Sequence, residues 1–309
     1  MDQAFSICVV GGVNVDITGL PDTALLLGDS NPGQVTLSPG GVGRNIAESL
    51  ARLGAEVSLV TALGSDIHAD WLRASCERAG ISLALAETVR GMPSGAYLCV
   101  NGERGDLCAA ISDMRVCEAI TPAWLASRLP ALNRSDAVVL DANLPEATIR
   151  WLADYVRPPL AADTVSVKKA GRLRGALPAL FLLKPNLPEA AILSGTASEG
   201  ENAPSLAAEA LIGAGVRNVM MTLGNRGAWY ADANRSGRQP CLTGPIVSTN
   251  GCGDASLSAA LLALLRGKDL SEAALLGQAA AAICARSPKA VNPEMTWSAI
   301  CELAGRSPE

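Results

Sequence analysis

A short glycine-rich stretch near the carboxyl end of the chain carries the residues best suited to chemistry, Asn250-Gly251-Cys252-Gly253-Asp254. It is followed by a run rich in Ala and Leu, residues 255–265, which favours a helix. Glycines let the backbone turn tightly, so the N–H groups of the turn and the positive end of the helix dipole face one small space. Such a space binds anions and would stabilise a phosphoryl group during its transfer.

The carboxylate in this turn has two interpretations. If Asp254 accepts the proton of an attacking hydroxyl group, its position beside an anion hole is explained. Alternatively, the stretch is an ordinary loop in which Asp254 caps the helix, because Asp is a favoured N-cap residue. Short glycine motifs recur by chance, so this stretch alone leaves both interpretations open.

Two polar residues near the amino end form a second candidate group. The apolar run 6–10 stops at two glycines, which is typical of a buried strand, and Asn14 and Asp16 follow it. Side chains just beyond the carboxyl end of a strand line the ligand crevice of an open α/β sheet, so both residues are candidates to bind hydroxyl groups. An Asx turn that ends the strand explains them equally well.

A second glycine-rich segment, residues 39–45, precedes a predicted helix. The apolar residues Ile46, Leu50 and Leu53 recur there at helical spacing before Gly54. The glycines of this segment allow a ligand to approach the backbone closely. A dinucleotide-binding fingerprint is not supported, because Ile46 stands at its third glycine position and no clear strand pattern precedes it.

Asn186 and Glu189 follow a predicted strand at residues 179–183 and are three positions apart. On the first turn of a helix, both side chains can face the hydration shell of a magnesium ion. A capping box, in which each side chain bonds the backbone N–H of the other residue, is at least as good an interpretation of the pattern.

The composition excludes several classes of protein. Of 309 residues, 49% are hydrophobic and 18% are charged, as in globular rather than disordered proteins. The net charge of −5 provides no basic surface for a nucleic-acid polymer or a membrane. The nine cysteines form no Cys-x-x-Cys pair, and a single histidine cannot complete a zinc site, which favours reduced thiols in a cytoplasmic protein. We expect no secretory signal and no membrane-spanning segment.

Strand and helix patterns alternate along most of the chain. The predicted strands repeatedly end in polar or glycine-rich residues, at Asn14, Asp141, Asp163, Asn186 and Gly224. This repetition predicts an α/β fold with a mostly parallel sheet and a crevice along one edge. Predicted helices cover residues 69–79, 145–156, 204–214, 255–266, 271–286 and 295–304.

Two segments are expected to form a small second sheet. Residues 17–38 contain a loop with short strands, and residues 95–111 contain a hairpin with its turn at 101–105. A small sheet outside the main body is one way to build a lid that closes over a ligand. Its exposed edge can pair with a second copy across a two-fold axis, so we expect a homodimer.

The combination of these motifs resembles the ribokinase-like family, also called the phosphofructokinase B family, of sugar and nucleoside kinases. Residues 39–45 resemble its Gly-Gly-x-x-x-Asn signature, residues 250–254 resemble its Gly-x-Gly-Asp signature, and Asn186-x-x-Glu189 lies between them as in the family. The resemblance covers nearly the whole chain. It implies a three-layer ribokinase-like fold, with a mostly parallel central sheet flanked by helices and a small β-sheet lid, and a single kinase domain over residues 1–309.

The resemblance also implies a role for each matching residue. Asp254 would be the base, and the amides of Gly251, Cys252 and Gly253 would form the anion hole. The ribose hydroxyls would be held by Asn14, Asp16, Gly40, Gly41 and Asn45. ATP would be bordered by Lys184, Asn186, Thr222, Gly224, Gly227 and Asn250. Glu189 would bind Mg²⁺ through water, and a requirement for a monovalent cation such as K⁺ stays open.

Two positions depart from the family pattern. The family usually has Ala where this chain has Cys252, and often has Pro after the aspartate where this chain has Thr164. Because backbone amides do not depend on the side chain, we expect the anion hole to survive, with a thiol added beside it.

Within the family, residues 29–33, residues 63–66 and Asp113-Met114 resemble the members that phosphorylate pseudouridine. This implies transfer from ATP to the 5′-hydroxyl of pseudouridine, giving pseudouridine 5′-phosphate and ADP. Ser30, Asn31 and Asp113 are the candidates to recognise the base. A kinase for ribose, adenosine or another small nucleoside or sugar remains an alternative, as does a ligand-binding relative without catalysis.

Overall fold

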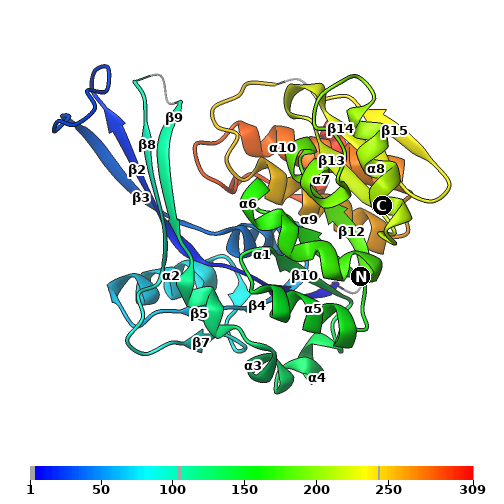
Figure 1. The fold of residues 1–309 in the computed structure, drawn as a ribbon, viewed down its shortest axis with the longest axis horizontal. Helices are drawn as coiled ribbons and strands as arrows, with labels where there is room; N and C mark the ends of the chain where they lie inside the picture. Colours follow the sequence, from blue (N-terminus) through cyan, green and yellow to red (C-terminus); the bar gives the residue numbers. More distant parts are fainter. Residues whose placement is uncertain (1–3, 104–105, 243, 309) are drawn as a thin grey trace.

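A large sheet forms the centre of the molecule (Figure 1). The computed structural model describes residues 4–103, 106–242 and 244–308. Within these ranges the sheet has nine strands, in the spatial order β15 (Ser236–Gln239), β14 (Ala228–Ala231), β13 (Val219–Thr222), β12 (Leu180–Lys184), β11 (Leu160–Asp163), β10 (Ala137–Asp141), β1 (Ser6–Val10), β4 (Glu56–Val60) and β6 (Ile81–Ser82). Strands β13 to β6 pair in parallel, and β14 and β15 add an antiparallel edge.

Helices cover both faces of this sheet, because neighbouring residues of each strand belong to opposite layers of the core. In β10, Val138 packs into one layer and Val139 into the other. One layer contains α1 (Val42–Arg52), α2 (Ile67–Arg78), α9 (Cys252–Leu265), α10 (Leu270–Ala285) and α11 (Trp297–Leu303). The other contains α3 (Pro122–Ala126), α4 (Leu129–Leu132), α5 (Glu146–Tyr155), α6 (Val167–Ala170), α7 (Leu187–Ser194) and α8 (Ala203–Gly213). The predicted three-layer α/β fold is confirmed.

A second sheet projects from this body, at the upper left of Figure 1. Its strands lie in the order β3 (Gly33–Gly40), β2 (Asn14–Pro21), β8 (Gly95–Asn101) and β9 (Leu107–Asp113), and we call it the lid sheet. Only β2 and β8 pair in parallel, so the lid sheet is mixed. Both predicted lid segments are therefore confirmed, although the turn predicted at 101–105 includes residues 104 and 105, which lie outside the described residues.

Smaller elements complete the described chain. Strands β5 (Ala62–Leu63) and β7 (Glu87–Thr88) form a two-stranded sheet. Three 3₁₀ segments are η1 (Arg115–Ala119), η2 (Gly171–Ala179) and η3 (Gly224–Arg226). Among the helices of the described ranges, none is both long enough and apolar enough to cross a membrane. That the chain forms a single kinase domain stays a prediction.

Two sequence-based expectations were wrong. A strand, β3, does precede the glycine-rich segment 39–45, where no strand pattern was recognised. Its residues 33–38 are all exposed, so β3 lacks the alternation of buried and exposed residues that marks a strand. The dinucleotide fingerprint still fails, because of Ile46. Asn14 and Asp16 do not form a turn after β1, since they begin β2 of the lid sheet.

Candidate active site

The first turn of α9 forms the centre of the candidate site. Gly251 precedes the helix in a left-handed conformation, with φ at 77°. A side chain there would collide with the carbonyl group of Ala290, so only glycine fits without a shift of the backbone. Because Gly251 has no side chain, it cannot cap the helix, and the amides of the first turn stay available to an anion.

Asp254 lies inside this first turn, so the interpretation of Asp254 as the N-cap residue was wrong. Its buried carboxylate accepts a hydrogen bond at Oδ2 from Nδ2 of Asn45, 3.0 Å away. Burial raises the pKa of Asp254 well above its usual value, and the charge of Asp163 raises it further, whereas Lys184 and Asn45 oppose this shift. A carboxylate with a raised pKa is a stronger proton acceptor.

A buried cation lies beside this carboxylate. Lys184, the last residue of β12, forms an ion pair between its Nζ and Oδ2 of Asp163, at 2.8 Å. A Cβ atom on Gly253 would come within 2.7 Å of the same Nζ, so the ammonium group lies against the turn that contains the amides. Burial opposes the charge of Lys184, but the contact with Asp163 and the nearby charges of Asp254 and Glu189 raise its pKa. A positive charge is thus held next to the anion hole.

The candidate acceptor residues gather at the base of the lid sheet. Asn14 donates a hydrogen bond from Nδ2 to Oδ1 of Asp16, at 2.6 Å. The register of β2 and β3 places Asn14 opposite Gly40, and a side chain on Gly40 would collide with the Asp16 carboxylate. Burial raises the pKa of Asp16, with Asn14 and Arg44 opposing it. Oxygen and nitrogen atoms suited to hydroxyl groups therefore line this corner.

Gly41 and Asn45 connect this corner to α9. Gly41 is the N-cap of α1 with φ at 101°, and a Cβ atom there would lie 2.5 Å from the carbonyl oxygen of Gly12. Asn45 lies on the first turns of α1 and reaches Asp254. The structure therefore brings together the predicted hydroxyl-binding residues of the amino-terminal part and the predicted base near the carboxyl end.

Asn186 and Glu189 form the capping box at the start of α7. Oδ1 of Asn186 accepts a hydrogen bond from the Glu189 amide at 2.9 Å, and Oε2 of Glu189 accepts one from the Asn186 amide at 2.8 Å. Thr164 also donates to Oε2 of Glu189, at 2.5 Å. Both of these hydrogen bonds to the Glu189 carboxylate end on its Oε2 atom. A hydrated magnesium ion would use Oε1, so capping and metal binding are compatible.

The remaining predicted ATP-binding residues lie near the ends of neighbouring strands. The Thr222 amide donates to the Pro185 carbonyl at 2.9 Å, which places the end of β13 beside Asn186. Gly224 and Gly227 bound the turn between β13 and β14, both with positive φ. Asn250 is exposed immediately before α9. Thr222 thus lies one strand away from Lys184, because β13 pairs with β12.

Ser30 and Asn31 are not brought to Asp254 within this chain. They lie in the loop between β2 and β3, at the far end of the lid sheet (Figure 1). The Asn31 side chain accepts from the Leu26 amide at 2.7 Å and donates to the Leu26 carbonyl at 2.9 Å, so it stabilises its own loop.

Asp113 is engaged by a neighbour. Arg115 donates to both of its carboxylate oxygens, at 2.9 and 2.6 Å, and these hydrogen bonds lower the pKa of Asp113. Both carboxylate oxygens of Asp113 are therefore already paired with Arg115.

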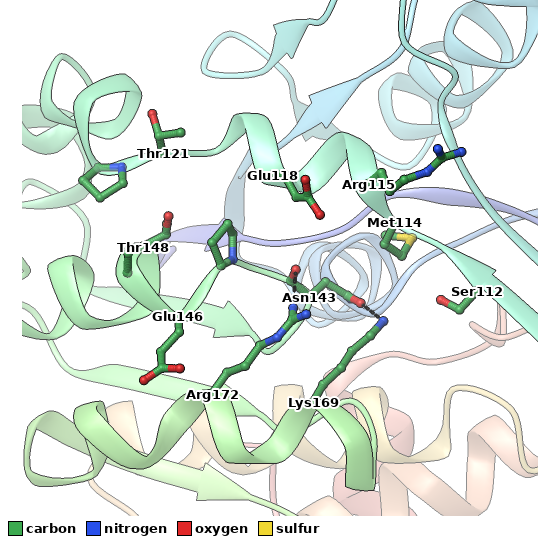
Figure 2. Close-up of a pocket in the computed structure, with 13 residues that line it drawn as sticks. Ser112, Met114, Arg115, Glu118, Thr121, Asn143, Glu146, Thr148, Lys169 and Arg172 are labelled. Carbon is green, nitrogen blue, oxygen red and sulfur yellow. Dashed lines mark hydrogen bonds between the residues drawn. The ribbon is translucent and has the colours of Figure 1, made fainter.

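A cavity of about 570 Å³ includes Met114 and Asn143 in its lining (Figure 2). It adjoins the acceptor corner, because Met114 and Asn14 are both neighbours of the position that a Cβ on Gly95 would occupy. Figure 2 shows Lys169 extending toward Asn143, and the Lys169 ammonium donates to Oδ1 of Asn143 at 2.6 Å. Met114 and Asn143 are the closest neighbours of the position that a Cβ on Gly12 would occupy. The cavity therefore lies against Gly12, just beyond the carboxyl end of β1. Arg115 also lines it.

Sequence reasoning missed the roles of Asn143 and Lys169. The strand end at Asp141 was a usable signal, because Asp141 accepts hydrogen bonds from the amides of Gly12 and Asn143, both at 2.8 Å. Lys169 lies on the four-residue helix α6, and its surrounding sequence carries no motif. Within the described ranges, no group of three or more His, Cys, Asp or Glu residues could hold a metal ion by itself.

Comparison with known proteins shows extensive similarity. The model of the pfkB family of carbohydrate kinases matches residues 4–297. The pseudouridine kinase of Escherichia coli K12 is 29% identical over 299 residues, covering 96% of each chain. An uncharacterized sugar kinase of the same strain is 32% identical over 294 residues, covering 93% of this chain and 80% of the relative.

Among solved structures, the ribokinase of Arabidopsis thaliana, complexed with ribose and ATP, superimposes with a TM-score of 0.87. The match covers 99% of this chain and 100% of that one at 23% identity, and it shows a common fold.

Proposed function

This chain belongs to the pfkB family of carbohydrate kinases, and from that premise we propose that it transfers the γ-phosphoryl group of ATP to the 5′-hydroxyl of pseudouridine. Members of this family use ATP and transfer a phosphoryl group to an alcohol of a sugar or nucleoside. The products here would be pseudouridine 5′-phosphate and ADP.

The hydrogen bond between Asn45 and Asp254 carries the proposal, because it joins the acceptor corner to the anion hole. A ribose held by Asn14 and Asp16 would present a hydroxyl group to Asp254. The carboxylate accepts the proton, the hydroxyl oxygen bonds to the γ-phosphorus, and the bond from that phosphorus to the β-phosphate oxygen breaks. The α9 amides and Lys184 stabilise the negative charge on the transferred group.

A magnesium ion fits the carboxyl ends of β11 and β12, since oxygen donors are its preferred ligands. Glu189 and Asn186 would hold it through water, and Glu189 is buried there beside Lys184. The ion would neutralise phosphate charge when bound. This chain contributes the fixed position of the Glu189 carboxylate, which the capping box and Thr164 hold in place.

The cavity behind Gly12 supports a nucleoside as acceptor, because a free sugar would leave it empty. The base of pseudouridine is attached through carbon and therefore carries an additional ring N–H. Asn143 offers an amide oxygen and Lys169 an ammonium group to the ring edge. Uridine lacks this N–H and would lose one hydrogen bond to Asn143, which costs about 0.5–1.5 kcal/mol, or roughly twofold to tenfold discrimination. The name of the relative at 29% identity agrees with this acceptor.

The lid sheet supports a homodimer. One row of its cross-strand neighbours is apolar on all four strands, with Leu37 beside Ile17, Ile17 beside Leu98, and Leu98 beside Ile111. Leu37, Leu98 and Ile111 are exposed in the single chain. An apolar row of this kind is covered when two copies pack their lid sheets together.

A kinase for another sugar or nucleoside is the second candidate, favoured by the 32% identity to a sugar kinase. The deciding experiment measures ADP release from ATP and Mg²⁺ with pseudouridine, uridine, adenosine and ribose at equal concentrations. We expect a strong preference for pseudouridine. Preference for another acceptor would retain the Asp254 mechanism and discard this substrate. Absence of turnover with all four, together with intact ligand binding, would support a relative without catalysis.

A further inference from the structure

Two cysteines meet beside the anion hole, and phosphoryl transfer uses neither thiol. Cys252 is the first residue of α9 and is half-buried, whereas Cys284 is buried near the end of α10. These two helices pack against each other. All nine cysteines of the chain are free.

Both thiols contact the same turn, residues 248–251. Sγ of Cys252 lies 3.9 Å from the Ser248 carbonyl oxygen, and Sγ of Cys284 lies 3.6 Å from the Asn250 carbonyl oxygen. Sγ of Cys284 also lies 3.2 Å from the carbonyl oxygen of Ala290, the group with which a side chain at Gly251 would collide. The one proton of Cys284 can be shared among these oxygens or given to Cys252, whose pKa it affects, so the two thiols are neighbours across the packed helices α9 and α10.

The environment makes the two thiols chemically unequal. A hydrogen bond from Cys284 lowers the pKa of Cys252, although burial opposes this, and the amino end of α9 also favours a thiolate. The hydrogen bond to Cys252 and burial raise the pKa of Cys284. A half-buried thiolate next to a protonated second thiol is the arrangement in which a peroxide oxidises the first and the second resolves the product.

We propose that Cys252 and Cys284 form an oxidative modification site, at which a peroxide converts the two thiols to a disulfide and thereby stops phosphoryl transfer. In the first step, the Cys252 thiolate attacks hydrogen peroxide, the O–O bond breaks, and Cys252 sulfenic acid and hydroxide form. Cys284 sulfur then attacks the sulfenic sulfur. The S–O bond breaks, and the departing hydroxyl and the earlier hydroxide leave as two waters with the protons of the two thiols.

A disulfide at this place acts on the anion hole through the backbone. Its geometry requires the two Cβ atoms to lie about 3.5–4.5 Å apart, so the bond would tie the first residue of α9 to α10 at a fixed separation. The adjoining Gly251 packs against the Ala290 carbonyl, so the new bond would constrain the turn from a second side. The amides of Cys252 and Gly253 therefore move, and loss of an oxyanion donor lowers turnover by about 100-fold or more.

The formation of the disulfide is independent of the proposed function, whereas the loss of turnover rests on it. Cys108 and Cys241 are exposed and would react between molecules, so the experiment uses the full chain with C108S and C241S. This protein is treated with hydrogen peroxide, alkylated, digested without reduction and mapped by mass spectrometry, and ADP formation is measured in parallel. We expect one Cys252–Cys284 linked peptide, a turnover loss of about 100-fold, and recovery with dithiothreitol.

Two further variants make the test specific. With Cys284→Ala, Cys252 cannot be resolved, so peroxide should give a dimedone-reactive sulfenic acid and then a loss that dithiothreitol does not reverse. With Cys252→Ala, the ratio of treated to untreated turnover should stay near one, whatever its absolute turnover. If Cys284→Ala does not fold, Cys284→Ser replaces it.

Three outcomes would overturn the proposal. They are the absence of the linked peptide, a linked peptide with unchanged turnover, or equal peroxide sensitivity of the Cys252→Ala variant. If the untreated protein forms no ADP with any acceptor, the proposed function fails, whereas the peptide map still decides whether the disulfide forms.

Discussion

Asn45 and Asp254 lie 209 positions apart in the chain, and Nδ2 of Asn45 donates a hydrogen bond to Oδ2 of Asp254 at 3.0 Å. This contact holds Asp254, the proposed base, at the boundary between the acceptor corner and the first-turn amides of α9. It also stabilises the ionised carboxylate, and thereby lowers the pKa that burial and the Asp163 charge raise. Asn45 thus affects both the position and the basicity of Asp254.

Replacing Asn45 by Ala removes this hydrogen bond and raises the pKa of Asp254 further. Because Asp254 must be ionised to accept a proton, activity increases with pH through its pKa, and the acid limb of the pH profile moves to higher pH in the variant. A hydrogen bond to a charged group contributes about 1.5–3 kcal/mol, which corresponds to a loss of roughly 10- to 100-fold in kcat/KM. If the acid limb did not shift, Asn45 would not be the residue that lowers the pKa of Asp254.

Replacing Asp254 by Asn should lower turnover by at least about 10²-fold, while ATP binding persists. The variant should also be more stable at neutral pH. The pKa of Asp254 is higher in the folded than in the unfolded state, so the folded state retains a proton that the unfolded chain has lost, and stability falls as pH rises through this window.

The Asn side chain does not titrate, so the variant does not lose stability as the pH rises through the pKa of Asp254. The gain in Tm for Asp254→Asn should therefore be small near pH 4 and increase with pH up to the folded pKa. Asp22→Asn, at an exposed position of the loop after β2, is the matched control and should change neither turnover nor this pH dependence. If the Asp254→Asn variant kept near-normal turnover, Asp254 would not be the catalytic base.

Replacing Gly251 by Ala should abolish activity, whereas Gly267→Ala should not. Both glycines have a left-handed conformation, with φ at 77° and 79°, so both variants lose about 1–2 kcal/mol of stability. Only at Gly251 does the new methyl group meet the Ala290 carbonyl, since Gly267 faces open space. Measurements of thermal unfolding and of ADP formation in the two variants check this difference. If both variants were equally active, the turn before α9 could be displaced without loss of activity.

Replacing Lys169 by Met should weaken binding of a nucleoside and leave binding of ribose unchanged. Lys169 reaches Asn143 inside the cavity that we assign to the base rather than to the ribose. Loss of one polar contact predicts an increase of about tenfold in KM for pseudouridine. The exposed neighbour Lys168→Met provides the control. Equal changes in KM for pseudouridine and ribose would place the base elsewhere.

Replacing Ile111 by Glu should dissociate the proposed dimer, because it places a charge in the apolar row of the lid sheet. Ala110→Glu, the next residue along β9, places the same charge on the opposite face and should leave the dimer intact. Analytical ultracentrifugation distinguishes the two results. A wild-type monomer at micromolar concentration would contradict the dimer directly.

Much of the fold follows from local patterns. Residues 7–10 of β1 are apolar because both faces of the strand are covered, and helix α9 follows from the Ala and Leu content of its sequence. Strand β3 lies in a segment that was expected to contain short strands, but its bounds could not be predicted because its residues face solvent, so its extended conformation depends on pairing with β2 rather than on burial. Strands β14 and β15 at the sheet edge were not predicted, since each has only four residues and β15, with the sequence Ser-Gly-Arg-Gln, contains no apolar residue.

The sequence by itself determined the local chemistry of the site. Glycines at 251 and 253 with a carboxylate at 254 predict a turn with open amides and a base, because backbone freedom and helix propensity are properties of neighbouring residues. Tertiary structure decided which groups meet. The pairing of β11 with β12 brings Lys184 to Asp163, and the packing of α9 against α1 and α10 brings Asp254 to Asn45 and Cys252 to Cys284. The lid sheet carries the loop with Ser30 away from the site. Such contacts depend on packing between distant segments, which no local pattern of residues encodes.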